Sequence, residues 1–258
     1  MRSRSPHDHR RGTDLSQRWV SATEHWLKER RIADAAELCG EWPAPEQRGR
    51  RRLALCSVTA EALVLGSGQR FEVVDAASAL RSAVDVVRRP AGGGAVFVAP
   101  GEQVWADVWL PRDDDLWDDD VVRSSRWVGA AWARALGALG VDDLVVADGP
   151  ATCDRWSRLL CFAGVGAGEV MAGGAKVVGV AQRRGRDGAR FLTMAHARWD
   201  PRRLVRLLAL APPEAERAAT ETAAACVGLE QLAGTSEEAR FVSSPLTAVE
   251  EALSGSMP

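Results

Sequence analysis

Residues 88–96, RRPAGGGAV, lie between two short apolar runs of the kind that form β-strands. The glycine triplet at 92–94 lets backbone N–H groups approach a ligand closely and adopt positive φ angles, and such a loop can form a nest for an anion. Arg88 and Arg89, just before the triplet, supply charge-assisted donors to a carboxylate or a phosphate. A glycine triplet alone is commonly a flexible turn, but the whole pattern at a strand junction predicts a binding loop for an anionic group.

Short strand-like runs lie on both sides of this loop along the chain. They occupy residues 53–58, 62–66, 84–88, 94–98 and 103–110. In the last run, QVWADVWL, both alternating faces are mostly apolar, which predicts a strand at the centre of a sheet. Asp107 lies between two tryptophans in this run, and a buried carboxylate needs a partner. We expect Arg88 or Arg89 to be that partner.

The remaining chain adds further strands and helices. The spacing of apolar residues predicts a helix from His25 to Leu38. More strands are expected at 143–147, 158–162, 168–172, 176–183 and 190–198, and more helices at 124–139, 200–210, 213–229 and 244–255. Strands mostly precede the long helices rather than alternating strictly with them. This order predicts the α+β class, with a mixed, largely antiparallel central sheet flanked by helices.

One lysine stands out in an arginine-rich chain. Only two of the 33 basic residues are lysines, and Lys176 lies in the segment 173–184, GGAKVVGVAQRR. A lysine reaches a phosphate or carbonyl oxygen as a point charge, and the planar fork of arginine does not replace it cleanly. On a strand, Lys176, Val178, Val180 and Gln182 share one face, while Gly179 leaves room on the other for a ligand or a backbone. Chance survival of a surface lysine is an equally good explanation of this residue taken alone.

Composition and charge argue against several classes of function. The 258 residues suffice for one large domain or slightly more, and a net charge of −2 gives no field that attracts nucleic acid. No apolar run approaches the ~20 residues that span a bilayer. Five cysteines, without a C-x-x-C pair, favour reduced thiols over disulfides or a zinc site. We therefore expect a cytoplasmic protein with no metal site, no nucleic-acid partner and no membrane contact.

Two polar segments are expected to lie outside the core. Residues 1–22 are typical of a disordered polar tail and lack the apolar stretch of a secretory signal. The acidic run at 113–120, DDDLWDDD, is expected to form a solvated loop or the start of a helix, because consecutive acids repel and point in different directions.

Three motifs together resemble the lipoate–protein ligase A family, within the wider biotin/lipoate ligase superfamily. They are LGSGQ at 65–69, RRPAGGGAV at 88–96 and K-x-x-G-x-A-Q at 176–182, and the resemblance runs from about Trp26 to Asp200. It implies a fold related to the catalytic domains of class II synthetases. We expect the catalytic domain at 23–200, with 201–258 as a helical extension packed on the same domain.

The resemblance implies a reaction in two steps. ATP, with Mg²⁺, activates lipoic or octanoic acid as an acyl-adenylate, and a lysine of a lipoyl carrier domain then attacks the anhydride. That carrier would be the glycine cleavage H protein or a 2-oxoacid dehydrogenase E2. Lys176 is the implied catalytic residue, and Trp105 and Trp109 are expected to wall a tunnel for the acyl chain. The implied substrate-binding residues are Arg88, Arg89, Gly92, Gly93, Gly94, Ala95, Gly179 and Gln182.

Cys161 leaves a second mechanism open. Cys161-Phe162, Glu169 and Lys176 resemble the pattern of the cysteine-dependent octanoyltransferases of the same fold. In those enzymes a thiolate accepts octanoyl from an acyl carrier protein thioester without ATP. Cys161 would then be the nucleophile and Lys176 the cation that activates it, whereas the common fate of a free cysteine is a buried structural thiol.

Departures from the family pattern leave a third reading open. The family typically follows GGGAV with an aromatic residue, His-Asp and then Gly-Asn, but residues 97–102 here read FVAPGE. A His-Gly stretch after the lysine strand is replaced by FLTMA at 191–195. These losses favour a homologue that binds an acyl group or a carrier domain without catalysis.

Overall fold

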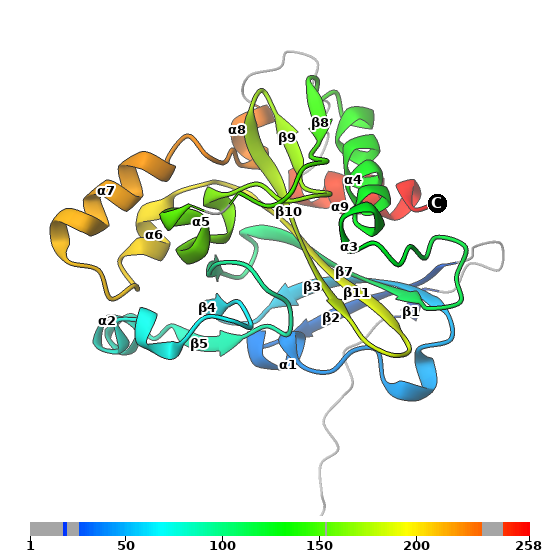
Figure 1. The fold of residues 1–258 in the computed structure, drawn as a ribbon, viewed down its shortest axis with the longest axis horizontal. Helices are drawn as coiled ribbons and strands as arrows, with labels where there is room; N and C mark the ends of the chain where they lie inside the picture. Colours follow the sequence, from blue (N-terminus) through cyan, green and yellow to red (C-terminus); the bar gives the residue numbers. More distant parts are fainter. Residues whose placement is uncertain (1–17, 20–25, 153, 234–244) are drawn as a thin grey trace, which may run out of the picture.

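An eight-stranded mixed sheet forms the centre of the computed structural model, which describes residues 18–19, 26–152, 154–233 and 245–258 (Figure 1). In spatial order its strands are β1 (Arg18–Trp19), β2 (Trp26–Ala33), β3 (Arg51–Val58), β7 (Gln103–Pro111), β11 (Gly188–His196), β10 (Ala175–Arg184), β9 (Val170–Ala172) and β8 (Leu144–Val146). Only the β2–β3 pair is parallel among the described strands of this sheet. The α+β class with a mixed, largely antiparallel sheet is therefore confirmed.

A smaller sheet carries the glycine-rich loop. Its strands are β5 (Asp85–Arg88), β4 (Ala62–Leu65) and β6 (Val96–Val98), with β4 in the middle, parallel to β5 and antiparallel to β6. The chain leaves β5, forms the loop at 89–95 and returns as β6 on the other side of β4. The loop therefore crosses the end of β4, which also leads into the 66–69 turn.

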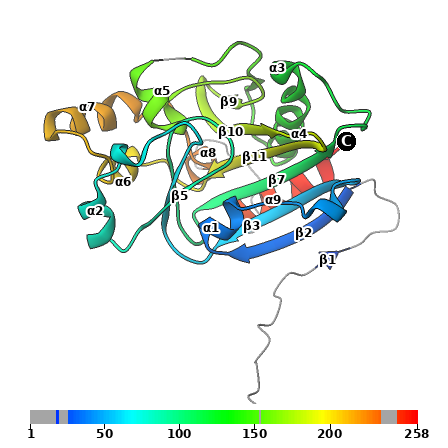
Figure 2. The same ribbon diagram turned by 60° about the horizontal axis from the view of Figure 1, so that its bottom comes forward.

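The large sheet is buried on both faces, and for this reason its central strands are apolar on both. One face packs against the helices α4 (Arg126–Ala138) and α9 (Pro245–Ser256). The other packs against the small sheet and α1 (Ala35–Cys39). Figure 2 shows α9 and α1 on opposite sides of the sheet. All nine residues of β7 are buried, as predicted for a central strand.

The predicted helix over 25–38 is wrong for most of its length. Residues Trp26–Ala33 form β2, which pairs in parallel with all eight residues of β3, and only Ala35–Cys39 are helical. The helical spacing rests on few apolar side chains, one of which, Ile32, remains 50% exposed. Hydrogen bonding to the neighbouring buried strand overrides so weak a local preference.

The predicted strand at 158–162 is also wrong. Residues Arg155–Leu159 form α5 and Cys161–Ala163 form a 3₁₀ turn. Asp154 and Ser157 cap α5 reciprocally, each side chain accepting from the other's backbone N–H. This capping pair competes successfully with the apolar character of residues 159–162.

The helices α6 (Pro201–Val205) and α7 (Pro212–Thr222) begin within a residue of the helices predicted at 200–210 and 213–229, but they end earlier. The short helices α2 (Ala76–Arg81), α3 (Val121–Ser124) and α8 (Leu229–Ala233) were not predicted as separate helices. The acidic run leads into a helix as expected, because the Asp120 side chain accepts from the N–H groups of Val122 and Arg123. Apart from the strand at Arg18–Trp19, the proposed tail at 1–22 lies outside the described residues. The division at residue 200 stays a prediction.

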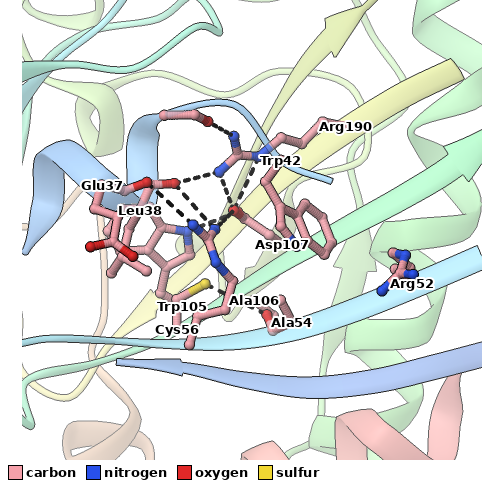
Figure 3. A network of polar contacts seen from close by, with 12 residues as sticks. Glu37, Leu38, Trp42, Arg52, Ala54, Cys56, Trp105, Ala106, Asp107 and Arg190 are labelled. Carbon is pink, nitrogen blue, oxygen red and sulfur yellow. Dashed lines mark hydrogen bonds and ion pairs between the residues drawn. The ribbon is translucent and has the colours of Figure 1, made fainter. Parts of the chain in front are cut away.

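The partner of Asp107 is neither Arg88 nor Arg89. Asp107 is fully buried and pairs with Arg190, whose Nε lies 3.1 Å from its Oδ2 (Figure 3). Arg190 also donates to the backbone carbonyls of Leu38 and Gly40, at 2.6 Å each. The pair therefore ties β7 and β11 to the end of α1.

No helix within the described ranges is long and apolar enough to cross a membrane.

Candidate active site

The glycine loop and the rare lysine line one cleft. Its volume is about 740 Å³, and its walls come from the turn at 66–69, the loop at 92–94, the segment 149–169 and strand β10. Gly92, Gly93, Gly94, Cys161, Lys176 and Gln182 all face it. The volume is within the range of about 300–1,000 Å³ that is usual for small-molecule sites.

Arg89 shapes the glycine loop from behind. Its side chain is buried and donates to the carbonyls of Val64 at 3.3 Å, Gly92 at 2.6 Å and Gly94 at 2.8 Å. Within the described residues, no hydrogen bond occupies the N–H groups of 92–94. The loop therefore keeps donors for an anion while its carbonyls are held by Arg89. Arg89 acts on the loop's conformation rather than at the cleft surface.

Glycine is required at two contacts of this loop. A Cβ on Gly66 would lie 1.9 Å from the Gly93 carbonyl oxygen, and one on Gly94 would lie 2.6 Å from the carbonyl carbon of Leu160. Gly93 itself has φ +95°, which side chains rarely tolerate. The loop is thus packed between the 66–69 turn and the segment that leads to Cys161.

Lys176 lies at the bottom of the cleft and is only 1% exposed. Its Nζ donates to the carbonyl oxygen of Cys161 at 2.7 Å and to Glu169 Oε2 at 2.9 Å. The Glu169 carboxylate also accepts from the N–H groups of Gly166 and Val180. Burial raises the pKa of Glu169, and the ammonium of Lys176 opposes that shift. These contacts fix the ammonium in one position.

The regular alternation predicted for 176–182 is interrupted. A register shift between Lys176 and Val178 breaks the pairing of β10 with β9. Val178 is buried in the core cluster beneath α4, whereas Lys176 and Gln182 line the cleft. The amide of Gln182 is oriented by Ser124, whose Oγ accepts from its Nε2 at 3.0 Å.

Cys161 lies where the cleft meets a second, apolar pocket of about 40 Å³. Its thiol is partly buried, with Arg89 Nη2 at 3.9 Å from Sγ. Lys176 donates to the backbone oxygen of Cys161, whereas the Arg89 guanidinium contacts its thiol. The small pocket is lined by Val64, Arg89, Val96, Trp105, Cys161, Phe162, Gly179, Val180, Ala181, Leu192, Thr193 and Met194.

Some predicted site residues lie away from the cleft. Arg88 is exposed and stacks over the ring of Phe71, with its Cζ 4.4 Å from the centroid. Ala95 is fully buried and contributes backbone contacts, accepting from the Cys161 N–H at 2.9 Å. Trp105 lines the apolar pocket, but Trp109 does not and donates instead to the Arg48 carbonyl.

Two site residues had no role assigned from the sequence. Glu169 belongs to the octanoyltransferase-like pattern without a role of its own, although a lone acid directly after the glycines of GAGEV is a signal in the sequence. Phe162 closes the apolar pocket, and a Cβ on Gly179 would lie 3.1 Å from its ring. The residue type at 179 is therefore explained by this contact with Phe162.

Solved structures of ligases share this fold. A bipartite lipoate protein ligase from Thermoplasma acidophilum, described with its E2 lipoyl domain, matches with TM-score 0.61 and 16% identity over 88% of this chain and 81% of that one. A putative lipoate protein ligase from T. acidophilum with bound lipoic acid gives 0.56 and 18%, over 81% and 74%. Lipoate-protein ligase A bound with ATP gives 0.54 and 21%, also over 81% and 74%. The chain therefore has the fold of these lipoate protein ligases.

The sequence itself carries the family signature. The model of the lipoyl protein ligase A/B catalytic domain matches residues 43–248, most of the chain. The chain therefore belongs to the lipoyl protein ligase A/B catalytic-domain family. Comparison with curated proteins gives no significant match.

Proposed function

We propose that this protein activates a medium-chain acyl group, lipoic or octanoic acid, as acyl-AMP and transfers it to a lysine of a lipoyl carrier domain. The observation that carries the proposal is the junction at Cys161, where an apolar pocket opens into a much larger cleft containing Lys176 and the glycine loop. An acyl chain and a polar, anionic head group need these two environments side by side.

The residues of the cleft fit the charge that develops in this reaction. The N–H groups at 92–94 offer donors to phosphate oxygens, and the fixed ammonium of Lys176 lines the same cavity. Donors that are already in place stabilise developing negative charge without reorganisation. Lys176 would bridge the acyl carbonyl and the α-phosphate. A carboxylate converted to a mixed anhydride then acylates an amine readily.

Mg²⁺ would enter with the nucleotide. Among the described residues, no three His, Cys, Asp or Glu side chains form a group that could hold a metal ion. Mg²⁺ commonly keeps several waters and binds through substrate phosphates, so the cleft fits a metal–nucleotide complex rather than a resident ion. ATP bound to one structural relative and lipoic acid bound to another support this pair of substrates.

A lipoyl carrier domain is the proposed acceptor. The E2 lipoyl domain described with the archaeal relative supports a carrier of this kind. The glycine cleavage H protein is the other candidate. The ε-amine of the carrier's lysine would attack the acyl carbonyl and release AMP.

The position of Cys161 favours a second candidate, ATP-independent octanoyl transfer. The thiol lines both cavities, next to where an acyl carbonyl would lie. Its thiolate would attack the thioester carbonyl of an octanoyl acyl carrier protein and expel the carrier's thiol. The lysine amine of the lipoyl domain would then attack the enzyme thioester and regenerate the cysteine.

Intact-mass spectrometry separates the two reactions. The protein is incubated either with ATP, Mg²⁺ and octanoate or with octanoyl acyl carrier protein, each with and without a lipoyl domain. For ligation we expect pyrophosphate release and an acylated lipoyl domain only with ATP, unchanged in Cys161→Ser. An octanoyl adduct on the enzyme that disappears in Cys161→Ser would instead establish the transferase. If neither reaction occurs while octanoate or the lipoyl domain binds, the protein is a non-catalytic binder.

A further inference from the structure

The apolar pocket follows one face of the large sheet. Residues that are directly opposite one another on neighbouring strands point to the same face, and the pairing connects β10 through β11 and β7 to β3. The opposed pairs on this face are Gly179–Met194, Ala181–Leu192, Met194–Trp105, Leu192–Asp107 and Cys56–Trp105. Gly179 and Ala181 leave space over β10, which the larger side chains of β11 and β7 progressively fill.

Trp105 lines this pocket from β7, which among the strands of the large sheet that line it is the furthest from β10. The pocket joins the cleft at Cys161, Val180 and Ala181, which line both cavities. Trp105 is on β7, two strands further along the sheet than β10, and Cys56 on β3 follows it. An acyl chain that enters at Cys161 and runs across β11 therefore meets the indole ring at its end.

The indole is held in place by a buried charge network. Trp105 Nε1 donates to Asp107 Oδ1 at 2.9 Å, and Trp105 is 3% exposed (Figure 3). Asp107 is in turn held by Arg190 on β11, with Arg31 Nη1 4.0 Å away. Because Arg190 is also bound to the carbonyls of Leu38 and Gly40, the network has little freedom to shift. The indole cannot swing aside without giving up its hydrogen bond inside the protein.

We propose that Trp105 is the end wall that sets the longest acyl chain the pocket accepts, and that Asp107 is the positioning residue that fixes this wall. The proposal deepens the function proposed above and rests on it for the choice of an acyl ligand. The pocket is small and apolar, so the place of its end wall decides how much chain fits. The selected ligand is an unbranched acyl chain with a defined upper length.

Binding of straight-chain carboxylates, from butanoate to tetradecanoate, tests the wall by calorimetry without ATP. Each methylene that fits should raise the affinity about fourfold. Affinity should therefore rise with chain length up to a maximum length and fall beyond it, and we call this maximum length the break. In Trp105→Ala we expect the break to move to longer chains by at least two methylenes. Trp109→Phe is the matched control, since Trp109 lies on the same face of β7 but outside the pocket, and should leave the break in place. An unmoved break in folded Trp105→Ala overturns the proposal, as does a failure of every chain to bind.

Loss of the Trp105–Asp107 hydrogen bond tests the positioning role. Asp107→Asn keeps an oxygen acceptor for the indole and should preserve the break. Asp107→Leu should let longer chains bind, so that affinity no longer falls sharply at one chain length. Trp105→Phe removes the same bond from its other end and should blur the break too, so the measurement does not depend on the fold tolerating a change at 107. A sharp, unmoved break in Trp105→Phe overturns the role of Asp107.

The readouts separate this inference from the proposed reaction. If the break moves in Trp105→Ala while neither pyrophosphate nor a thioester forms, the end wall stands and the proposed catalysis fails. The opposite result is that the wild-type protein acylates a lipoyl domain while the break does not move in Trp105→Ala. Trp105 then has no part in chain selection, and the proposed reaction stands.

Discussion

Acidification tests the burial of His196, a residue on β11 at the edge of the site. Its ring packs against Phe162, with centroids 4.5 Å apart, and against Trp199 at 5.6 Å. Among the described residues its Nε2 has no hydrogen-bond partner. Burial, together with the positive charges of Lys176 and Arg203, lowers the pKa of His196 from 6.5 to about 4.

The sign of the effect on stability follows from proton uptake. Between pH 6.5 and about 4 the unfolded chain binds a proton at His196 that the folded chain does not. His196 therefore does not lower the free energy of unfolding above pH 6.5. As the pH falls from 6.5 toward 4, protonation of the unfolded chain at His196 lowers the free energy of unfolding progressively. At 1.36 kcal/mol per pKa unit, the loss is about 3 kcal/mol.

Urea denaturation at a series of pH values measures this loss. His196→Phe keeps an aromatic ring between Phe162 and Trp199 but removes the titrating group. Carboxylates that also titrate in this range are common to both proteins, so the difference between their free energies of unfolding isolates His196. We expect wild type to lose about 3 kcal/mol relative to the variant from pH 7 to pH 4. If the difference stays constant across that range, His196 is not buried in the way described.

Three further substitutions test other parts of the structure. Lys176→Arg should lower pyrophosphate release at least about 100-fold, because the guanidinium cannot reproduce the position of the ammonium; near wild-type release would exclude Lys176 from the chemistry. Gly94→Ala should lose about 1–3 kcal/mol in urea denaturation, because its Cβ would meet backbone at 2.6 Å. Gly92→Ala, which has nothing within 4 Å of its Cβ, is the control and should unfold like wild type. Asp107→Ala should lose about 3–5 kcal/mol, because it leaves Arg190 charged and buried, and a loss below about 1 kcal/mol would contradict the pairing.

Strands with strong local patterns were predictable from the sequence. The runs at 53–58, 103–110 and 190–198 are apolar on alternating or both faces, and they became β3, β7 and β11. The segment 26–33 was not predictable in this way, since its strand state depends on pairing with β3, a partner more than 20 residues away. A local pattern contains no information about such a neighbour.

The features of the site can be separated in the same way, into those that the motifs predict and those that depend on the assembled sheet. That the glycine triplet and Lys176 face one cleft followed from motifs whose order and spacing resemble a known family. The contacts of Lys176 with Glu169 and the Cys161 carbonyl depend on how β10 bulges between 176 and 178. The choice of Arg190 over the nearer arginines depends on the register of two strands that are 83 residues apart at this pair. Register is set by the assembled sheet.

The Asp107–Arg190 pair restricts how this protein can change over evolutionary time. Replacing either residue alone strands a charge in the interior, whereas exchanging both for apolar side chains of similar volume is often neutral or stabilising. Two simultaneous substitutions are rare, so the stable double variant is reached only through a single variant that is destabilised. Descendants of this sequence are therefore expected to keep both residues or to have lost both, and a natural sequence with a lone charge at this place should carry a new counter-charge nearby.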